Sequence, residues 1–190
     1  MFEPCKKIKE LMSGFDRPWA IAGGWAVDLH VNRLTREHSD IEIAVFRHDQ
    51  FKLKQYLNSF AFRKVVNGQL IEWSGEELIL PVHELHASNG EQDIEILLNE
   101  SKDGNWLFRR EPQIYYDAGR VIENSTDSFP YLIPVIVLLY KAKHLREMDH
   151  ADFLVLRDVL NDKDRIWLLK SLEIHQPGHP WIRLLGGIRT

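Results

Sequence analysis

The sequence predicts an α+β fold in which a mixed β-sheet is flanked by helices and followed by a helical carboxy-terminal part. Three observations support this. Short apolar stretches of strand and helix periodicity alternate near the amino terminus, the middle of the chain is rich in strand-like runs and turn signals, and helical spacing dominates after residue 128. We therefore expect an α/β domain at residues 1–128 and a helical subdomain at residues 129–190.

The first elements are expected to be a helix, a strand, a glycine turn and a second helix. Residues 5–15 place apolar side chains at helical spacing. The apolar run at residues 19–22 leads into Gly23 and Gly24, and a buried helix is expected from Trp25 onward. Glycines at such a turn let the backbone approach a ligand closely, and the amides of the helix start favour a bound phosphate.

Residues 40–46 alternate in polarity, which predicts a half-buried strand with two acids on one side. Asp40 and Glu42 then point the same way and bring two carboxylates to one hard cation such as Mg²⁺. An isolated pair of this kind is more often a solvated outer face. A second pair on another apolar strand, Asp93 and Glu95, favours a site, because neighbouring strands would bring three carboxylates together.

The rest of the chain divides into a sheet-rich region and a helical region. Residues 49–60 have helical spacing, and residues 62–123 alternate β-like runs with turn signals such as Asn-Gly and Ser-Gly. From residue 130 to about 173 the pattern is helical. Breakers at residues 176–180 precede one last amphipathic segment.

The composition of the chain limits which classes of partner it is expected to bind and in which cellular compartment it is expected to work. The chain has 24 Lys and Arg against 28 Asp and Glu, and its net charge is −4, so it has no basic stripe for duplex nucleic acid. Cys5 is the single cysteine, which fits a reducing cytoplasm. The longest apolar run, residues 131–140, contains Pro134 and is shorter than the roughly 20 residues of a membrane span. We expect no membrane partner.

Two runs of residues around the glycine turn form a longer motif. They are Gly23-Gly24-Trp25-Ala26-x-Asp28 and Arg33-x-Thr35-Arg36-x-His38-x-Asp40-Ile41-Glu42. Together they closely resemble the aminoglycoside 2''-adenylyltransferase branch of the DNA polymerase β-like nucleotidyltransferases, which is near the lincosamide nucleotidyltransferases. The resemblance is strong over residues 18–47. It continues more loosely through Glu95-x-Leu97-Leu98, Trp106-x-x-Arg109-Arg110 and the segment from Pro130 to Lys143.

The resemblance implies a nucleotidyltransferase-type sheet and an enzyme that moves a nucleoside monophosphate, AMP from ATP, onto a small-molecule hydroxyl. An aminoglycoside or lincosamide antibiotic is the natural acceptor, which would make the activity one of antibiotic resistance. By position, Asp40 and Glu42 correspond to the metal-binding pair and Gly23 and Gly24 to the triphosphate turn. Glu95 is preferred over Asp93 as the third carboxylate, and as the base, because the Ile-Leu-Leu that follows it fits the family's strand better.

Two cationic side chains are candidates for binding the phosphates of the nucleotide. Arg36 lies just before the acidic strand, where it would clamp a phosphate or else pair with a neighbouring glutamate. Lys141 follows an apolar helical face, and it is either a cation at a helix end or a ligand of the triphosphate; the resemblance favours the ligand. Arg109 and Arg110 are explained almost as well by an exposed strand end, and they stay outside the predicted site.

Two departures from the wider superfamily motivate an alternative function. Trp25 stands where serine is usual and supplies no hydroxyl to a phosphate, so backbone donors would have to suffice. Glu42 and Glu95 stand where aspartate is common, and the extra methylene moves each carboxylate outward by roughly one bond. The alternative is a non-catalytic nucleotide- or protein-binding module with a degenerate site. The enzyme remains the favoured hypothesis.

Overall fold

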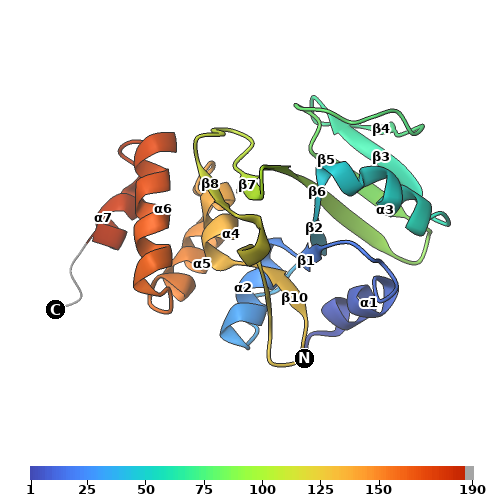
Figure 1. The fold of residues 1–190 in the computed structure, drawn as a ribbon. Helices are drawn as coiled ribbons and strands as arrows, with labels where there is room; N and C mark the ends of the chain where they lie inside the picture. The colour runs from blue at the N-terminus through green and yellow to red at the C-terminus, as the bar shows by residue number, and fades with distance from the viewer. Residues whose placement is uncertain (187–190) are drawn as a thin grey trace.

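A computed structural model describes residues 1–186 as a mixed sheet with helices packed around it (Figure 1). The main sheet has the order β4-β3-β5-β6-β2-β1-β10-β9, and β7 and β8 continue from the far end of β6. This confirms the predicted fold class. The strands are β1 (Trp19–Ile21), β2 (Glu42–Phe46), β3 (Ala61–Val66), β4 (Gln69–Glu72), β5 (Glu84–Ser88), β6 (Asp93–Lys102), β7 (Asn105–Leu107), β8 (Tyr115–Asp117), β9 (Ile122–Asn124) and β10 (Pro130–Leu132).

The helices gather in two groups around the sheet (Figure 1). α1 and α3 lie near β2 to β6, whereas α2 packs on α4, α5 and β10, and α6 and α7 extend the second group to the left of the view. Within residues 1–186, no helix has both the length and the apolar character that crossing a membrane takes. The helices are α1 (Glu3–Leu11), α2 (Gly23–Val31), α3 (Gln50–Tyr56), α4 (Pro134–Lys141), α5 (Glu147–Arg157), α6 (Asp162–His175) and α7 (Pro180–Gly186), with short 3-10 helices η1 (Arg47–Asp49) and η2 (Ala118–Arg120).

The centre of the sheet determines where the acidic residues lie. β2 runs antiparallel to β1 and parallel to β6, with Glu42 in register with Glu95 and Ile43 with Ile96. Residues in register point to the same face and successive residues to opposite faces. One face therefore buries isoleucines in the core, and the other presents the two glutamates.

Two boundaries near the predicted site differ from the sequence-based expectation. The second helix begins at Gly23 itself rather than after the glycine pair, and β2 begins at Glu42 rather than Asp40. Asp40 is kept out of the ladder because the Trp25 indole donates a 2.8 Å hydrogen bond to its carbonyl oxygen. Pairing with β6 starts one residue later, where the Glu95 amide donates to the Ile41 carbonyl at 3.0 Å.

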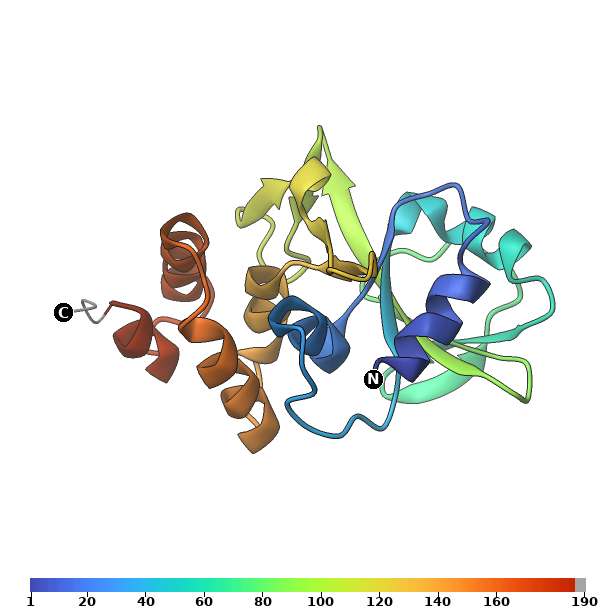
Figure 2. The ribbon, with the colours of Figure 1, turned by 90° about the horizontal axis from the view of Figure 1, so that it is seen from below.

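The segment after residue 128 begins with a strand before it becomes helical. β10 lies parallel to β1, with Tyr131 in register with Ile21, and antiparallel to β9. Helices α4 to α7 follow it, and α4 is buried along nearly its whole length. The division into domains at residue 128 stays a prediction, and residues 187–190 of its second part lie outside the described residues. Figure 2 shows α5, α6 and α7 on the side of the molecule away from α1.

Candidate active site

Carboxylates from three neighbouring strands share one face of the sheet. Glu42 on β2 lies beside Glu95 on β6, and Glu95 in turn lies beside His86 on β5. Glu84 precedes His86 by two residues and therefore shares its face. Oxygen and nitrogen atoms of Glu84, His86 and Glu95 all lie within 4.8 Å of one another. The sheet register thus places two further polar groups next to the predicted pair of glutamates.

Asp40 reaches this face from the loop that precedes β2. Its side chain is exposed, and the Ser39 hydroxyl donates a 2.9 Å hydrogen bond to its carboxylate. The negative charge of Asp40 raises the pKa of both Glu42 and Glu95, so the three acids interact electrostatically. Among residues 1–186, however, Asp40, Glu42 and Glu95 do not together form a group of ligand atoms at metal-binding distances.

The acidic face carries uncompensated charge. Burial raises the pKa of Glu42 to about 7, and the carboxylates of Glu95, Asp40 and Glu84 add to that rise while Lys141 opposes it. Burial also raises the pKa of Glu95, with a further contribution from Asp40. A divalent cation would remove this repulsion, and carboxylate oxygens are the donors that Mg²⁺ prefers. The residues present therefore fit a magnesium site.

Gly23 is required at its position for two reasons. Its φ of +59° lies in the left-handed region, and a Cβ placed on it would lie 1.5 Å from a carboxylate oxygen of Glu42. No side chain caps the start of α2, whose N-cap is Ala22. The first amides of α2 therefore open directly beside the Glu42 carboxylate, where a phosphate bound to a shared cation would meet them.

Gly24 allows the loop before β2 to pack against the start of α2. A Cβ at Gly24 would lie 2.3 Å from an Arg36 guanidinium nitrogen and 2.5 Å from the His38 ring. Behind this contact, the fully buried Asp28 carboxylate is 2.7 Å from His38 Nε2 and accepts hydrogen bonds from the Thr35 amide and hydroxyl. The motif residues between the two predicted ligand groups thus hold the loop to the helix.

Trp25 also helps to hold the loop before β2 against α2. Its ring lies 4.4 Å from the His38 ring, between centroids, and its indole nitrogen holds the Asp40 carbonyl. A tryptophan that replaces a phosphate-binding serine therefore has a structural reason to be there, since it fixes the backbone that carries Asp40. Asp28 and Thr35 belong to the recognised motif, but only their contacts reveal that they support the site.

The predicted cations meet at two buried aspartates of α5. Lys141 Nζ lies 3.0 Å from Asp149 and 2.9 Å from Asp152, and Arg36 makes two 3.2 Å hydrogen bonds to Asp152. Burial raises the pKa of Asp149, but hydrogen bonds from Arg146 and Lys141 outweigh it, and the net shift is downward. The carboxylate that pairs with Arg36 is thus Asp152 of α5, and the neighbouring Glu37 contributes only its backbone carbonyl, which accepts a 3.0 Å hydrogen bond from Arg36.

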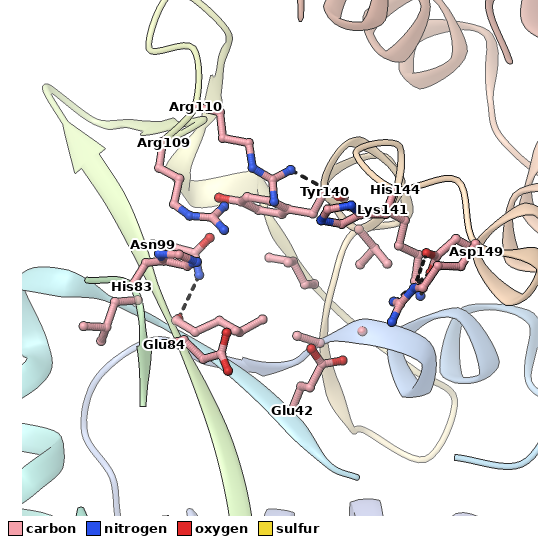
Figure 3. A pocket seen from close by; sticks show the side chains of 17 residues that line it. Glu42, His83, Glu84, Asn99, Arg109, Arg110, Tyr140, Lys141, His144 and Asp149 are labelled. Carbon is pink, nitrogen blue, oxygen red and sulfur yellow. Dashed lines mark hydrogen bonds and ion pairs between the residues drawn. The ribbon is translucent and has the colours of Figure 1, made fainter. Parts of the chain in front are cut away.

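A cavity of about 270 Å³ connects the glycine turn, Glu42 and Lys141 (Figure 3). Arg109, Arg110 and Tyr140 line its other side, and Glu84 points into it from β5. Asp40 and Glu95 line a separate, smaller hollow of about 170 Å³ instead. Gly24 and Arg36 do not contribute to the wall of the main cavity. The predicted residues are therefore divided between two hollows, with Glu42 in the wall of the main cavity and its register neighbour Glu95 in the wall of the other.

Comparison with known proteins identifies the family to which the sequence is similar. The sequence profile described as aminoglycoside-2''-adenylyltransferase matches residues 5–154. Among proteins with curated descriptions, none matches the chain by sequence.

Solved structures share the fold at low sequence identity. LnuA, a lincosamide antibiotic adenylyltransferase with lincomycin bound, has a TM-score of 0.60 at 20% identity. The match covers 84% of this chain and 98% of LnuA. ANT(2'')-Ia in complex with adenylyl-2''-tobramycin has a TM-score of 0.56 at 18% identity, and the match covers 90% of this chain and 97% of ANT(2'')-Ia. An antigenic nucleotidyltransferase-like protein from Paracoccidioides brasiliensis has a TM-score of 0.52 at 13% identity, and the match covers 96% of this chain and 90% of that protein.

Proposed function

The chain belongs to the aminoglycoside-2''-adenylyltransferase family of nucleotidyltransferases, and from that premise we propose that it transfers AMP from Mg-ATP to a hydroxyl of a small molecule. One observation carries the proposal. The opening of α2 at Gly23, the Glu42 carboxylate and the Lys141 ammonium line one cavity, so a phosphate-binding turn, a metal-binding acid and a cation face a common space.

Asp40, Glu42 and Glu95 would hold the metal in this proposal. When bound, Mg²⁺ supplies positive charge that neutralises the triphosphate and the departing pyrophosphate. Glu84 is a further oxygen donor, since it lies in the same cavity as Glu42 and in the same cluster as Glu95. The extra methylene of Glu42, which the sequence suggests would loosen the site, is accommodated here by the absence of any side chain at Gly23.

The nucleotide would lie along the glycine turn. The amides of Gly23 and Gly24 donate to phosphate oxygens, and Lys141 approaches the phosphates from α4. Asp149 and Asp152 hold the Lys141 ammonium in place, which reduces the side-chain freedom that binding would otherwise remove. Arg36 is the weaker of the two predicted cations, because its side chain does not line the main cavity, whereas that of Lys141 does.

Glu95 is the candidate for the base. Burial raises its pKa, and a carboxylate with a raised pKa accepts a proton more readily near neutral pH. The acceptor hydroxyl gives its proton to Glu95 while its oxygen bonds to the α-phosphorus of ATP. The bond from that phosphorus to the β-phosphate bridge breaks, and pyrophosphate leaves.

The test is pyrophosphate release from Mg-ATP with a panel of hydroxyl compounds that includes aminoglycosides and lincosamides, the acceptors that the family suggests. Glu42→Gln and Asp40→Asn are expected to lower turnover at least 100-fold, because each removes a charged metal ligand. Glu91→Gln, at an exposed turn, is the matched control. Calorimetry with Mg²⁺ and a nonhydrolysable ATP analogue tests the first step independently, and tight analogue binding without added Mg²⁺ that survives both substitutions would count against the proposal.

A further inference from the structure

Two adjacent arginines line a part of the cavity that the proposed function leaves unassigned. Arg109 and Arg110 follow β7 in a tight turn, which a 2.9 Å hydrogen bond from the Phe108 amide to the Ile114 carbonyl closes at its base. Both side chains extend from this turn into the cavity (Figure 3). The sequence suggested an exposed strand end here, whereas both residues are partly buried.

The end of α4 holds both guanidinium groups. The central carbon of Arg109 lies 4.8 Å from the Tyr140 ring centroid, and that of Arg110 lies 5.4 Å from the same ring. Arg110 also donates a 3.2 Å hydrogen bond to the Tyr140 carbonyl. A guanidinium has five N–H donors, so donors beyond the one bound to Tyr140 remain for a ligand. Lys141 is the next residue of α4 and lines the same cavity, so one helix end anchors all three cations.

Of these cations, the two arginines keep a charge that no carboxylate offsets by contact. Among residues 1–186, neither guanidinium forms an ion pair shorter than 4.0 Å, whereas Lys141 and Arg146 both bind Asp149. Burial lowers the pKa of Arg110 to about 10, and the positive charge of Arg109 adds to that shift. Arg110 is still charged at neutral pH, so two positive charges lie side by side. A bound anion would relieve their repulsion.

The cavity has an acidic side as well as this basic one. Glu42 and Glu84 lie across it from Arg109 and Arg110 (Figure 3). A triphosphate that carries a divalent cation needs both sides, because carboxylates hold the cation and guanidinium groups bind phosphate oxygens through paired hydrogen bonds. Anion binding by the arginines also leaves the two glutamates available to positive charge, whether of a metal ion or of a cationic acceptor. The lining therefore suits an anionic donor and sets no condition on the charge of the acceptor.

We propose that the Arg109–Arg110 pair binds the β- and γ-phosphates of the nucleoside triphosphate and holds the pyrophosphate as it leaves. The inference rests on the proposed function, in which the phosphates lie along the Gly23 turn. When the bond from the α-phosphorus to the bridging oxygen breaks, its electron pair stays on that oxygen, and negative charge grows on the pyrophosphate. The arginines donate hydrogen bonds to this charge and transfer no proton.

The test compares ligands that differ in the phosphates beyond the first. With Mg²⁺ present, calorimetry on the full chain measures the affinity for pyrophosphate and for a nonhydrolysable ATP analogue, and displacement of that analogue measures the affinity for AMP. In the wild type the analogue should bind at least about 10-fold more tightly than AMP, because charge-assisted hydrogen bonds to the distal phosphates add to its affinity.

The variants assign that gain to the arginines. The double variant Arg109→Gln, Arg110→Gln should bind pyrophosphate and the analogue at least about 10-fold more weakly than the wild type, and AMP equally well. The double lysine variant should lose less, since lysine keeps the charge but not the planar fork of donors. Arg120→Gln, at an exposed position, should match the wild type with all three ligands. Circular dichroism checks that each variant folds.

Three outcomes would overturn the inference. The first is a wild type that binds AMP as tightly as the analogue. The second is a double glutamine variant that keeps the wild-type affinity for pyrophosphate and the analogue. The third is an equal loss of AMP affinity in that variant, which would mean that the arginines only hold α4 in place. The wild-type titration separates this inference from the proposed function, because a wild type that does not bind the analogue with Mg²⁺ contradicts the proposed function itself.

Discussion

Glu42→Gln should make the metal-free protein more stable at pH 8 while it abolishes transfer. Glutamine has nearly the shape of glutamate but carries no charge, so it removes the cost of burying the Glu42 carboxylate and the smaller repulsion that Glu42 experiences from Glu95, Asp40 and Glu84. The substitution therefore separates the electrostatic cost of the site from its packing.

The magnitude follows from the pKa shift of Glu42. A rise from 4.5 to about 7 is worth about 3 kcal/mol at 1.36 kcal/mol per unit, and coupling to Glu95 reduces the usable figure to about 1–3 kcal/mol. Folded protein keeps the Glu42 proton up to about pH 7, whereas the unfolded chain releases it near 4.5. Between these values the folded state binds more protons, so wild-type stability falls as pH rises and the deficit is complete above pH 7.

The assay is urea unfolding in EDTA, followed by the fluorescence of buried tryptophans such as Trp73 and Trp106. Glu42→Gln should exceed the wild type by about 1–3 kcal/mol at pH 8 and match it near pH 4.5. Excess Mg²⁺ should raise wild-type stability and close the gap. The exposed control Glu91→Gln should leave the free energy of unfolding within about 0.5 kcal/mol of the wild type at both pH values. A variant that is less stable than the wild type at pH 8, or equally stabilised at both pH values, would refute the reasoning.

Three further predictions concern the supports of the site. Gly23→Ala should lower the free energy of unfolding more than Gly68→Ala does, and only Gly23→Ala should reduce transfer. Both glycines have a positive φ, which costs an alanine about 1 kcal/mol, but only a Cβ at Gly23 would meet a side chain. Equal losses of stability in the two variants would contradict this. Asp28→Asn should cost about 1–3 kcal/mol and lower kcat more than it raises KM for ATP, a pattern that a purely global loss of stability would not give. Lys141→Met should destabilise by about 3 kcal/mol at pH 7, because it removes the ammonium from two buried aspartates. The pKa of Asp149 lies below its ordinary 3.8, so this loss should persist at pH 4 and shrink only as the pH falls further and Asp149 gains a proton; a loss that stays the same at every pH would argue for packing instead.

The sequence by itself determined the fold class and the identity of the acidic strand. Period-two alternation at residues 40–46 and the glycine pair before a helix are local signals, and strand and helix formation follow largely from local patterning. The same locality explains the errors at element ends. Nothing near Asp40 reveals that an indole fifteen residues earlier holds its carbonyl, so the start of β2 could not be placed from the pattern. β10 is three residues long, and it becomes a strand because β1 and β9 flank it.

Which polar groups share the site was decided by tertiary structure. The parallel register of β2 and β6 puts Glu95 rather than Asp93 beside Glu42, and the antiparallel register with β5 adds Glu84 and His86. No spacing along the chain encodes these pairings, because register depends on the packing of whole sheet faces.

The balance of charge in the cavity was likewise decided by tertiary structure. Arg109 and Arg110 look like an ordinary strand end in the sequence, and only the structure shows them partly buried beside Tyr140, with no ion pair to a carboxylate among residues 1–186. Lys141 lies close to aspartates that follow it by 8 and 11 residues, because α5 folds back against α4. The local sequence thus supplied the chemical groups of the site, and long-range packing decided which of them remain uncompensated and available to a ligand.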